Sequence, residues 1–526
     1  MIDANQIPNL GSLVREAAQR YGDKTFLRFE GASITFAALE EQTNRLAHVL
    51  ESLGVKQGDR VAVMLNNGFH FPISWLAIAK LGAIMVPVNT QYQHDDLRFV
   101  LRDSGALFLV TSPEFLPLVL QVKPECESLG TITVFGNSNQ ALELEPAMQL
   151  APPSFALPDV ARAALLNLQY TSGTTGFPKG CMLSHAYWLE LGARASELLH
   201  CTPDDVNLTV QPFYYMDPQW NVALCLLNGI PLVVAPKFSV SRFWQTVIDE
   251  GVTFFYCLGT IPVFLLKQPE NPALERGHKL RFVSCSGIVP QFHALFESRF
   301  GVPWREGFGM TETGVDIGVP LASGDRVGSG SIGQPVPGKQ ARIIRTDESG
   351  LETVLPDGEV GELVVSGGVM MQGYWNRPDD SARALRGGWM HTGDLAYRAA
   401  NGDYFLVGRL KDMIRRGSEN IAAVEVEAVI CEHKSVLMVA VVAEKDEARG
   451  EEVKALVQLR VGATLEPHEL LEFLRPKLAK FKLPRYIAFV DSFPLTPSEK
   501  IAKHKLNSPE YAVKTFDALE EIWRNA

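Results

Sequence analysis

The chain has 526 residues, of which 46% are hydrophobic and 21% charged, a composition typical of an ordinary globular protein. At about 150 residues per domain, this length predicts three or four folding units. The formal net charge of −11 argues against a dedicated nucleic-acid-binding protein, which normally carries a basic face.

The first hundred residues alternate between helix and strand patterns. Leucines from Leu39 to Leu53 recur at helical spacing, and Gly54 stands where that helix would end. Residues 60–65 (RVAVML) predict a strand, residues 75–81 a helix, and the apolar residues that follow (AIMVPV) a second strand. This order predicts a parallel sheet with helices packed on it.

Three later stretches complete the expected fold. Strand and helix patterns alternate again over residues 208–266 and 280–300, whereas residues 332–365 have short strands and glycine-rich turns, which indicate a small β subdomain. The expected fold class is α/β, with a large N-terminal domain of α/β subdomains plus this β subdomain (residues 1–408). A small, mobile α/β C-terminal lid domain follows (residues 409–526).

Cysteine usage and hydropathy bear on where the protein works. The seven cysteines are odd in number, scattered and never in a C-x-x-C pair, which favours reduced thiols over disulfides or a zinc site. The N-terminal residues lack the basic and apolar regions of a secretory signal. The most apolar stretch, residues 221–236, is too short and too broken to cross a bilayer. We therefore expect a cytoplasmic protein without a transmembrane segment.

The strongest chemical signal is the run YTSGTTGFPKG, residues 170–180, which lies between two strand-like stretches. Glycines allow the backbone to approach a ligand, hydroxyl and amide groups can surround phosphate oxygens, and Lys179 adds a positive charge. The run is not a Walker loop, because the G-x-x-x-x-G-K-[ST] spacing is absent and no helix pattern starts behind the lysine. By itself it could also be a flexible turn.

This run resembles the phosphate-loop signature of the adenylate-forming superfamily, which includes acyl-CoA synthetases, luciferases and the adenylation domains of peptide synthetases. Further motifs of that superfamily follow in the expected order as far as Lys500, so the resemblance covers nearly the whole chain. It implies an enzyme that activates a small carboxylic acid with ATP and Mg²⁺. The residues of the run that it assigns to the nucleotide are Thr171, Ser172, Gly173, Thr174, Thr175 and Lys179.

A second matching motif is GFGMTE, residues 307–312. A hydroxyl next to a carboxylate can orient a phosphate and hold Mg²⁺, which prefers oxygen ligands, although an isolated Thr–Glu pair is more often a solvated turn. The resemblance implies that Thr311 contacts the α-phosphate and that Glu312 binds the metal. Phe308 stands where relatives usually have tyrosine. The further nucleotide contacts that the resemblance implies are Gly287, Glu306, Gly307 and Phe308.

Two later motifs concern the ribose and the hinge. WMHTGD, residues 389–394, resembles the ribose-binding motif of the superfamily, in which Asp394 accepts hydrogen bonds from the ribose hydroxyls, although a lone aspartate after glycine is usually a turn residue. In GRLKD, residues 408–412, the resemblance implies that Arg409 lies near the nucleotide and that Lys411 is the pivot between the two domains.

The motif PLTPSEKI, residues 494–501, resembles the one that carries the catalytic lysine. A carboxylate that attacks an anionic phosphate needs a cation to reduce the repulsion between them, and the resemblance assigns this role to Lys500. Relatives often have glycine before this lysine, whereas Glu499 stands here and could partly neutralise it. Without the resemblance, a lysine in a proline-rich segment would be interpreted as solvent-exposed.

The resemblance implies two half-reactions in one site. The carboxylate attacks the α-phosphorus of ATP, and then the small domain turns about the hinge so that a thiol can displace AMP. Coenzyme A is the expected thiol, because Gly417, Ser418 and Glu419 lie in a loop similar to the one that faces the thioester site in acyl-CoA synthetases. A separate acyl-carrier protein is the alternative acceptor, and a catalytically silent nucleotide-binding relative is a further alternative.

The pocket for the acid is expected around QPFYYMD, residues 211–217, where the family often has Pro-x-Phe-His. Tyr215 replaces the histidine, and the context of Asp217 is similar to the crotonobetaine/carnitine–CoA ligase branch. Aromatic faces attract quaternary ammonium groups, so a betaine-like acid is one hypothesis, and a small aliphatic or aryl acid is another. Any one of the aromatic rings could instead be plain core. The residues expected in this pocket are Tyr214, Tyr215, Asp217, Ser286 and Gly287.

Overall fold

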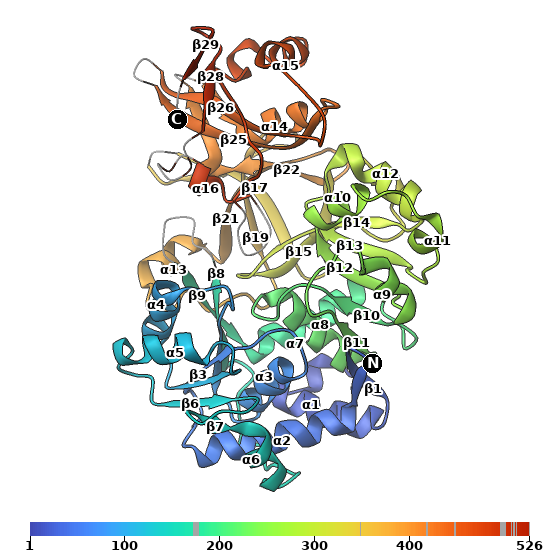
Figure 1. Ribbon diagram of the computed structural model, residues 1–526, viewed down its shortest axis with the longest axis vertical. Coiled ribbons are helices and arrows are strands. Elements are labelled where there is room, and N and C mark those ends of the chain that lie inside the picture. The colour runs from blue at the N-terminus through green and yellow to red at the C-terminus, as the bar shows by residue number, and fades with distance from the viewer. Residues whose placement is uncertain are drawn as a thin grey trace. The chain divides into compact units, whose positions relative to one another are not determined.

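The structure is a computed structural model that describes residues 1–171, 178–347, 349–416, 419–446, 449–494, 501–506, 508, 511 and 513–524. The chain divides into two compact units (Figure 1). The first unit consists of Met1–Ala341 with Val365–Met390, and the second of Arg342–Val364 with His391–Ala526.

One sheet of the first unit is built from the N-terminal part of the chain. Its strands, in sheet order, are β7 (Leu142–Glu143), β6 (Thr131–Val134), β5 (Phe108–Thr111), β3 (Arg60–Met64), β4 (Ile84–Pro87), β8 (Leu165–Thr171) and β9 (Lys179–Ser184). Neighbouring strands are parallel, apart from the antiparallel pair β8–β9. The parallel sheet expected from the first hundred residues is confirmed.

Along the chain, the helices of this N-terminal part lie before or between the strands of this sheet. They are α1 (Leu10–Tyr21), α2 (Phe36–Ser52), α3 (His70–Lys80), α4 (His94–Ser104), α5 (Leu116–Val122) and α6 (Leu144–Leu150). Thr35 caps α2 by accepting a hydrogen bond from the backbone N–H of Ala38, 3.1 Å away. Helix α3 begins at His70, earlier than its apolar pattern predicted, because Pro72 lies in the first turn, where a proline needs no backbone donor.

A second sheet of the first unit comes from later residues and the N-terminal hairpin. Its strands, in sheet order, are β16 (Ser331–Pro335), β15 (Gly314–Gly318), β14 (Trp304–Met310), β13 (Phe282–Ser286), β12 (Phe254–Leu258), β10 (Asn207–Thr209), β11 (Leu232–Val234), β1 (Thr25–Phe29) and β2 (Ala32–Thr35). From β14 to β1 the neighbours are parallel. The carboxyl ends of β12, β13 and β14 therefore meet at one edge.

Between these strands run the helices of the same region. They are α7 (His185–Leu198), α8 (Met216–Asn228), α9 (Phe243–Asp249), α10 (Thr260–Leu266), α11 (Pro272–Glu275) and α12 (Pro290–Phe300), and later α13 (Pro378–Ala384) follows before the short strand β20 (Leu385–Arg386). The strand–helix alternation expected over residues 208–266 and 280–300 is confirmed.

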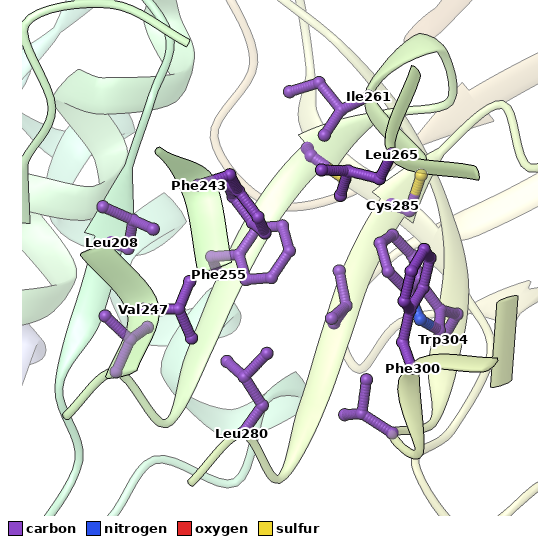
Figure 2. Packing of buried hydrophobic residues seen from close by; sticks show 14 of the residues in the cluster. Leu208, Phe243, Val247, Phe255, Ile261, Leu265, Leu280, Cys285, Phe300 and Trp304 are labelled. Atoms are coloured by element: carbon purple, nitrogen blue, oxygen red, sulfur yellow. The ribbon is translucent and has the colours of Figure 1, made fainter. Parts of the chain in front are cut away.

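The core beneath this edge is dense in aromatic rings. Figure 2 shows Phe243, Phe255, Phe300 and Trp304 packed together with aliphatic side chains. The ring centroids of Phe255 and Trp304 are 5.9 Å apart, and those of Phe300 and Trp304 6.1 Å. Burial of such rings stabilises the packing of α9 and α12 on β12 and β14, so the strand ends that follow have fixed positions.

The second unit is mostly β structure before its C-terminal part. Its early strands are β17 (Gln340–Thr346), β18 (Glu352–Val354), β19 (Gly361–Ser366), β21 (Trp389–Arg398) and β22 (Tyr404–Arg409), followed by a 3₁₀ turn over Leu410–Asp412. The C-terminal part contains β23 (Met413–Arg416), β24 (Glu419–Ala422), α14 (Ala423–Cys431), β25 (Val436–Asp446), β26 (Gly450–Leu459), α15 (Pro467–Leu474), β27 (Tyr486–Phe489), α16 (Lys503–Leu506), β28 (Thr515–Asp517) and β29 (Ile522–Arg524).

Apolar faces of β25, β26 and α14 form the core of this C-terminal part. Val439, Val453, Val426 and Ile487 belong to one buried cluster. The expected fold class, α/β with a small β region and a C-terminal α/β unit, is confirmed. The domain boundary expected between residues 408 and 409 marks a proposed hinge movement, not a division in packing. It stays a prediction. Within the described ranges, each helix is too short or too polar to span a membrane.

We predict that Gly229→Ala destabilises the protein more than Gly251→Ala. Both glycines follow helices with positive φ, +67° and +64°, so each alanine costs about 1–2 kcal/mol of backbone strain. At Gly229 the new Cβ would also overlap the ring of Tyr21, whereas at Gly251 it meets no described atom within 4 Å. Overpacking adds about 1–3 kcal/mol. Urea midpoints measure the difference, and equal losses of stability would contradict the packing at Tyr21.

Candidate active site

The glycine-rich run joins two neighbouring antiparallel strands. β8 ends at Thr171 and β9 begins at Lys179, and these two residues face each other in the ladder. The expected order of strand, loop and strand is therefore confirmed. Ser172, Gly173, Thr174 and Thr175 lie outside the described residues, so their contacts with a nucleotide stay predictions.

Lys179 is held by residues from a distant part of the chain. Its ammonium nitrogen lies 3.0 Å from a carboxylate oxygen of Asp380 and 5.2 Å from the ring centroid of Tyr374. The hydrogen bond from Lys179 is the largest cause of a lowered pKa at Asp380. Neither partner was predicted from the sequence, because neither lies in a motif that suggested chemistry.

Thr311 and Glu312 occupy the turn between β14 and β15. The Glu312 side chain is buried, and its Oε1 accepts a hydrogen bond of 2.8 Å from the hydroxyl of Tyr374. Burial, followed by the charge of Glu312, raises the pKa of Tyr374. The Tyr187 hydroxyl donates to the carbonyl of Thr311, and the backbone N–H of Met371 donates to the carbonyl of Glu312. The turn is thus fixed from several directions.

A buried ion pair lies directly behind this turn. The ammonium nitrogen of Lys339 is 3.0 Å from Oδ1 of Asp316 and donates to the carbonyl oxygen of Thr313, 2.6 Å away. The Thr313 hydroxyl donates to the same carboxylate. All three side chains are buried. No sequence motif indicated this pair, because a lysine behind a Pro-Gly turn looks like a surface residue.

Glu306 binds the turn after β13. Its two carboxylate oxygens accept backbone N–H bonds from Gly287 (2.7 Å) and Ile288 (2.5 Å). Gly287 has φ of +88°, so this turn favours glycine. The hydroxyl of Ser286 donates to the carbonyl of Gly307, 2.6 Å away, which joins the ends of β13 and β14. The geometry gives Glu306 a positioning role, and nucleotide contacts of Gly287, Glu306, Gly307 and Phe308 stay predictions.

The residues expected around the acid lie at the start of α8 and at the ends of β12 and β13. Asp217 is in the first turn of α8, where the indole N–H of Trp220 donates to its Oδ1 over 3.4 Å. The rings of Trp220 and Tyr256 are nearly perpendicular, with centroids 5.6 Å apart. The Tyr256 hydroxyl donates to Ser286, 3.1 Å away. The structure thus connects Asp217 with Ser286 through two aromatic side chains.

Other aromatic residues near Asp217 and Tyr256 differ in burial. Tyr214 and Tyr215 have ring centroids 4.7 Å apart, and Tyr214 is buried. Phe213, Phe254 and Phe255 are almost fully buried, so they belong to the core. The sequence motifs did not single out Tyr256, yet it contacts both Trp220 and Ser286; its position at a strand end could have distinguished it.

Asp394 and Arg409 lie together in the second unit. They face each other in the ladder of β21 and β22, and the Arg409 Nε is 2.8 Å from Asp394 Oδ1. Asp394 is buried, while the Arg409 side chain is 46% exposed. The hydroxyl of Thr392 accepts the backbone N–H of Asp394 and donates to the carbonyl of Leu363. The two residues that the sequence assigned to one ligand are therefore neighbours.

Several residues that the resemblance singled out, or their side chains, fall outside the part of the chain that the structure describes. Gly417, Ser418 and Lys500 lie outside the described residues, as do the side chains of Lys411 and Glu419. The backbone of Lys411 belongs to the 3₁₀ turn Leu410–Asp412. The catalytic role of Lys500, the hinge at Lys411 and the CoA-side loop therefore stay predictions.

A magnesium ion fits this site only if water and substrate oxygens complete its coordination. Among the described residues, no group of three or more His, Cys, Asp or Glu side chains could hold a metal by itself. Mg²⁺ commonly takes one or two protein carboxylates and completes its shell with water and substrate phosphates. A single fixed carboxylate such as Glu312 is compatible with that arrangement.

Comparison with known families now identifies the kind of enzyme. A model described as AMP-binding enzyme matches residues 14–375, and one described as AMP-binding enzyme C-terminal domain matches residues 425–500. The chain belongs to the AMP-binding enzyme family. This AMP-binding enzyme is 34% identical to the crotonobetaine/carnitine–CoA ligase of Citrobacter koseri, over 95% of this chain and 98% of the relative.

Solved structures agree with this assignment. ATP-bound MatB from Rhodopseudomonas palustris superposes with a TM-score of 0.88 and 27% identity, over 96% of this chain and 99% of MatB. The anthranilate CoA ligase AuaEII in complex with anthranoyl-AMP superposes with a TM-score of 0.87 and 26% identity, over 96% of this chain and 98% of that enzyme. Within the AMP-binding enzymes the chain is an acyl-CoA ligase, as the resemblance implied.

We predict that Lys339→Met lowers the free energy of unfolding by about 3–5 kcal/mol, because it leaves the Asp316 carboxylate buried without its cation. The control variant Lys56→Met, at an exposed lysine, changes the free energy of unfolding by less than about 0.5 kcal/mol. Adding Asp316→Leu to the first variant recovers more than half of the loss, since the stranded charge is removed. Urea denaturation measures all three, and a double variant as unstable as Lys339→Met alone would contradict this.

Proposed function

We propose that this acyl-CoA ligase activates a betaine-like carboxylic acid, one that carries a quaternary ammonium group, and transfers its acyl group to coenzyme A. The observation that supports this substrate is the half-buried carboxylate of Asp217 next to the ring of Trp220, which in turn contacts the ring of Tyr256. A quaternary ammonium group cannot donate a hydrogen bond, so aromatic faces and a nearby negative charge are what can recognise it.

The relatives support the same class of acid. The names of the relatives at 33–34% identity specify crotonobetaine and carnitine, both of which carry a quaternary ammonium group. The neighbouring structures that carry the names of aryl acids share less, at 26% identity. An aryl acid is the second candidate, because Tyr214 and Tyr215 add further aromatic surface to the same stretch.

The first half-reaction joins two anions. A carboxylate oxygen of the acid bonds to the α-phosphorus of ATP, and the bond to pyrophosphate breaks, which gives an acyl-adenylate. No general base is needed, because the acid is ionised at neutral pH. In the proposed site Thr311 would contact the α-phosphate, Glu312 would hold Mg²⁺, which would offset phosphate charge, and Lys500 would supply a cation for the reacting anions.

The second half-reaction needs a different arrangement of the two domains. The thiol sulfur attacks the acyl carbon and AMP leaves with the carboxylate oxygen. The two family matches end at residue 375 and begin at residue 425, so the proposed domain boundary at 408/409 and the pivot Lys411 lie between them. Gly417, Ser418 and Glu419 follow the pivot closely, which supports their proposed place on the coenzyme A side.

A panel of carboxylic acids with ATP and coenzyme A, analysed by mass spectrometry, tests the proposed function. We expect an acyl-CoA from an acid with a quaternary ammonium group, together with AMP and pyrophosphate. Release of AMP only when a carrier protein is supplied would contradict coenzyme A as the acceptor. Products from benzoate-like acids alone would contradict the betaine-like substrate.

We predict that Asp217→Asn removes the preference for a cationic acid. The two substrates to compare are crotonobetaine and its uncharged isostere, with a tert-butyl group in place of trimethylammonium. The wild type should prefer the cation in kcat/KM by about tenfold, and Asp217→Asn should bring the ratio close to one. Asp204→Asn, at an exposed aspartate, is the matched control. An equal loss of activity toward both acids would show that Asp217 has another role.

Lys500→Ala should lower the rate of adenylate formation by about a hundredfold or more, because a charge that stabilises the transition state is lost. It should leave thioester formation from supplied acyl-adenylate nearly unchanged. Lys411→Pro should do the reverse, since it restricts the proposed pivot. Each half-reaction is measured separately, by pyrophosphate exchange and by acyl-CoA formation. Loss of both steps in either variant would contradict the division of roles.

A further inference from the structure

We propose that residues 374–380, here called the anchoring segment, belong to the phosphate site together with the glycine-rich run and the turn of Thr311 and Glu312. In this segment Tyr374 positions Glu312 and Asp380 positions Lys179. This inference rests on the proposed function, since it concerns the two side chains that would meet Mg²⁺ and the phosphates of ATP. No motif of the sequence pointed to this segment. It joins residues that are far apart in the chain but lie within the first unit.

On one side, Tyr374 fixes the metal-binding carboxylate. Its hydroxyl donates to Oε1 of Glu312 over 2.8 Å, and the Glu312 side chain is buried. A carboxylate with one oxygen held in this way has fewer orientations, so it can present the same face to each incoming ion. Hydrogen bonds of this kind from residues behind a metal ligand commonly strengthen metal binding.

On the other side, Asp380 fixes the lysine of the glycine-rich run. Its carboxylate lies 3.0 Å from the Lys179 ammonium nitrogen, and both side chains are about one-fifth exposed. The ammonium group also lies over the ring of Tyr374. A free lysine side chain loses rotamer entropy when it is ordered by a ligand. A lysine that is already ordered avoids much of that cost, and it keeps further N–H donors for phosphate oxygens.

The anchoring segment itself is tied to the strands beside the glycine-rich run. The backbone N–H of Trp375 donates to the carbonyl of Gly180 on β9, 2.8 Å away. Asp103, in the last turn of α4, accepts hydrogen bonds of 2.8 Å from both the Arg377 guanidinium and the hydroxyl of Tyr170 on β8. The segment is therefore fixed to both β8 and β9. The backbone that carries the side chains facing Lys179 and Glu312 thus has a fixed position.

Tyr374→Phe tests the first contact. Loss of a buried hydrogen bond to a carboxylate should raise the Mg²⁺ concentration for half-maximal adenylate formation by about tenfold. Thioester formation from supplied acyl-adenylate should keep its wild-type rate, which a general structural defect would not allow. Tyr21→Phe is the matched control, because it removes a hydroxyl that donates to Leu227, remote in the chain from Glu312.

Asp380→Ala tests the second contact. We expect the KM for ATP to rise about threefold, with little change in kcat for thioester formation, because the partly exposed ion pair contributes modestly. Asp380→Asn should recover part of the change, since its amide oxygen still accepts a hydrogen bond. Asp379→Ala is the control: Asp379 is exposed and shares the first turn of α13, so it matches Asp380 in its effect on the helix.

The outcomes separate the two proposals. If the wild type forms no adenylate from any acid, the proposed function and this inference both fail. If the wild type is active and Tyr374→Phe keeps the wild-type Mg²⁺ requirement, or Asp380→Ala keeps or lowers the KM for ATP, the positioning role of that residue is wrong while the proposed function stands.

Discussion

The reaction brings together a carboxylate and a triphosphate, and their mutual repulsion is the constraint on which the site depends. In the proposed site, the first unit meets this repulsion with groups that are fixed before the substrates arrive. Glu312 lies in a turn held by Tyr187, Tyr374 and Met371. Lys179 is held by an ion pair. Preorganised charges of this kind need little rearrangement during the reaction. They therefore stabilise the transition state more than water does.

Buried polar groups support the turns of the site from behind. Lys339 and Asp316 neutralise each other next to Thr313, and Glu306 binds the backbone of the turn at Gly287. Such groups are costly to bury unless they are paired, so their presence at these turns indicates that the geometry there is maintained at some expense in stability. The parallel strands beneath are packed by aromatic side chains, so the turns begin from fixed positions.

Local patterns and the order of the motifs in the sequence predicted the fold class. The parallel sheet follows from the alternation of strand and helix patterns, and the structure agrees. The resemblance assigned Asp394 and Arg409 to one nucleotide without predicting a contact between them, and the structure shows that they form an ion pair. The contacts of Tyr374 and Asp380 could not be predicted, because they depend on how segments distant in the chain pack together. The buried Lys339 was also missed, since composition says nothing of which lysine has a buried partner. The early start of α3 shows that an apolar pattern predicts the first and last residues of a helix poorly.

In this reaction the carboxylate of the acid attacks the α-phosphorus of ATP, and the same oxygen leaves with AMP. An acid labelled with ¹⁸O in its carboxylate, incubated with the enzyme, ATP and coenzyme A, tests this directly. The predicted result is one ¹⁸O atom in the phosphate of AMP, detected by mass spectrometry. Label in inorganic phosphate, with ADP as the nucleotide product and none in AMP, would contradict attack at the α-phosphorus.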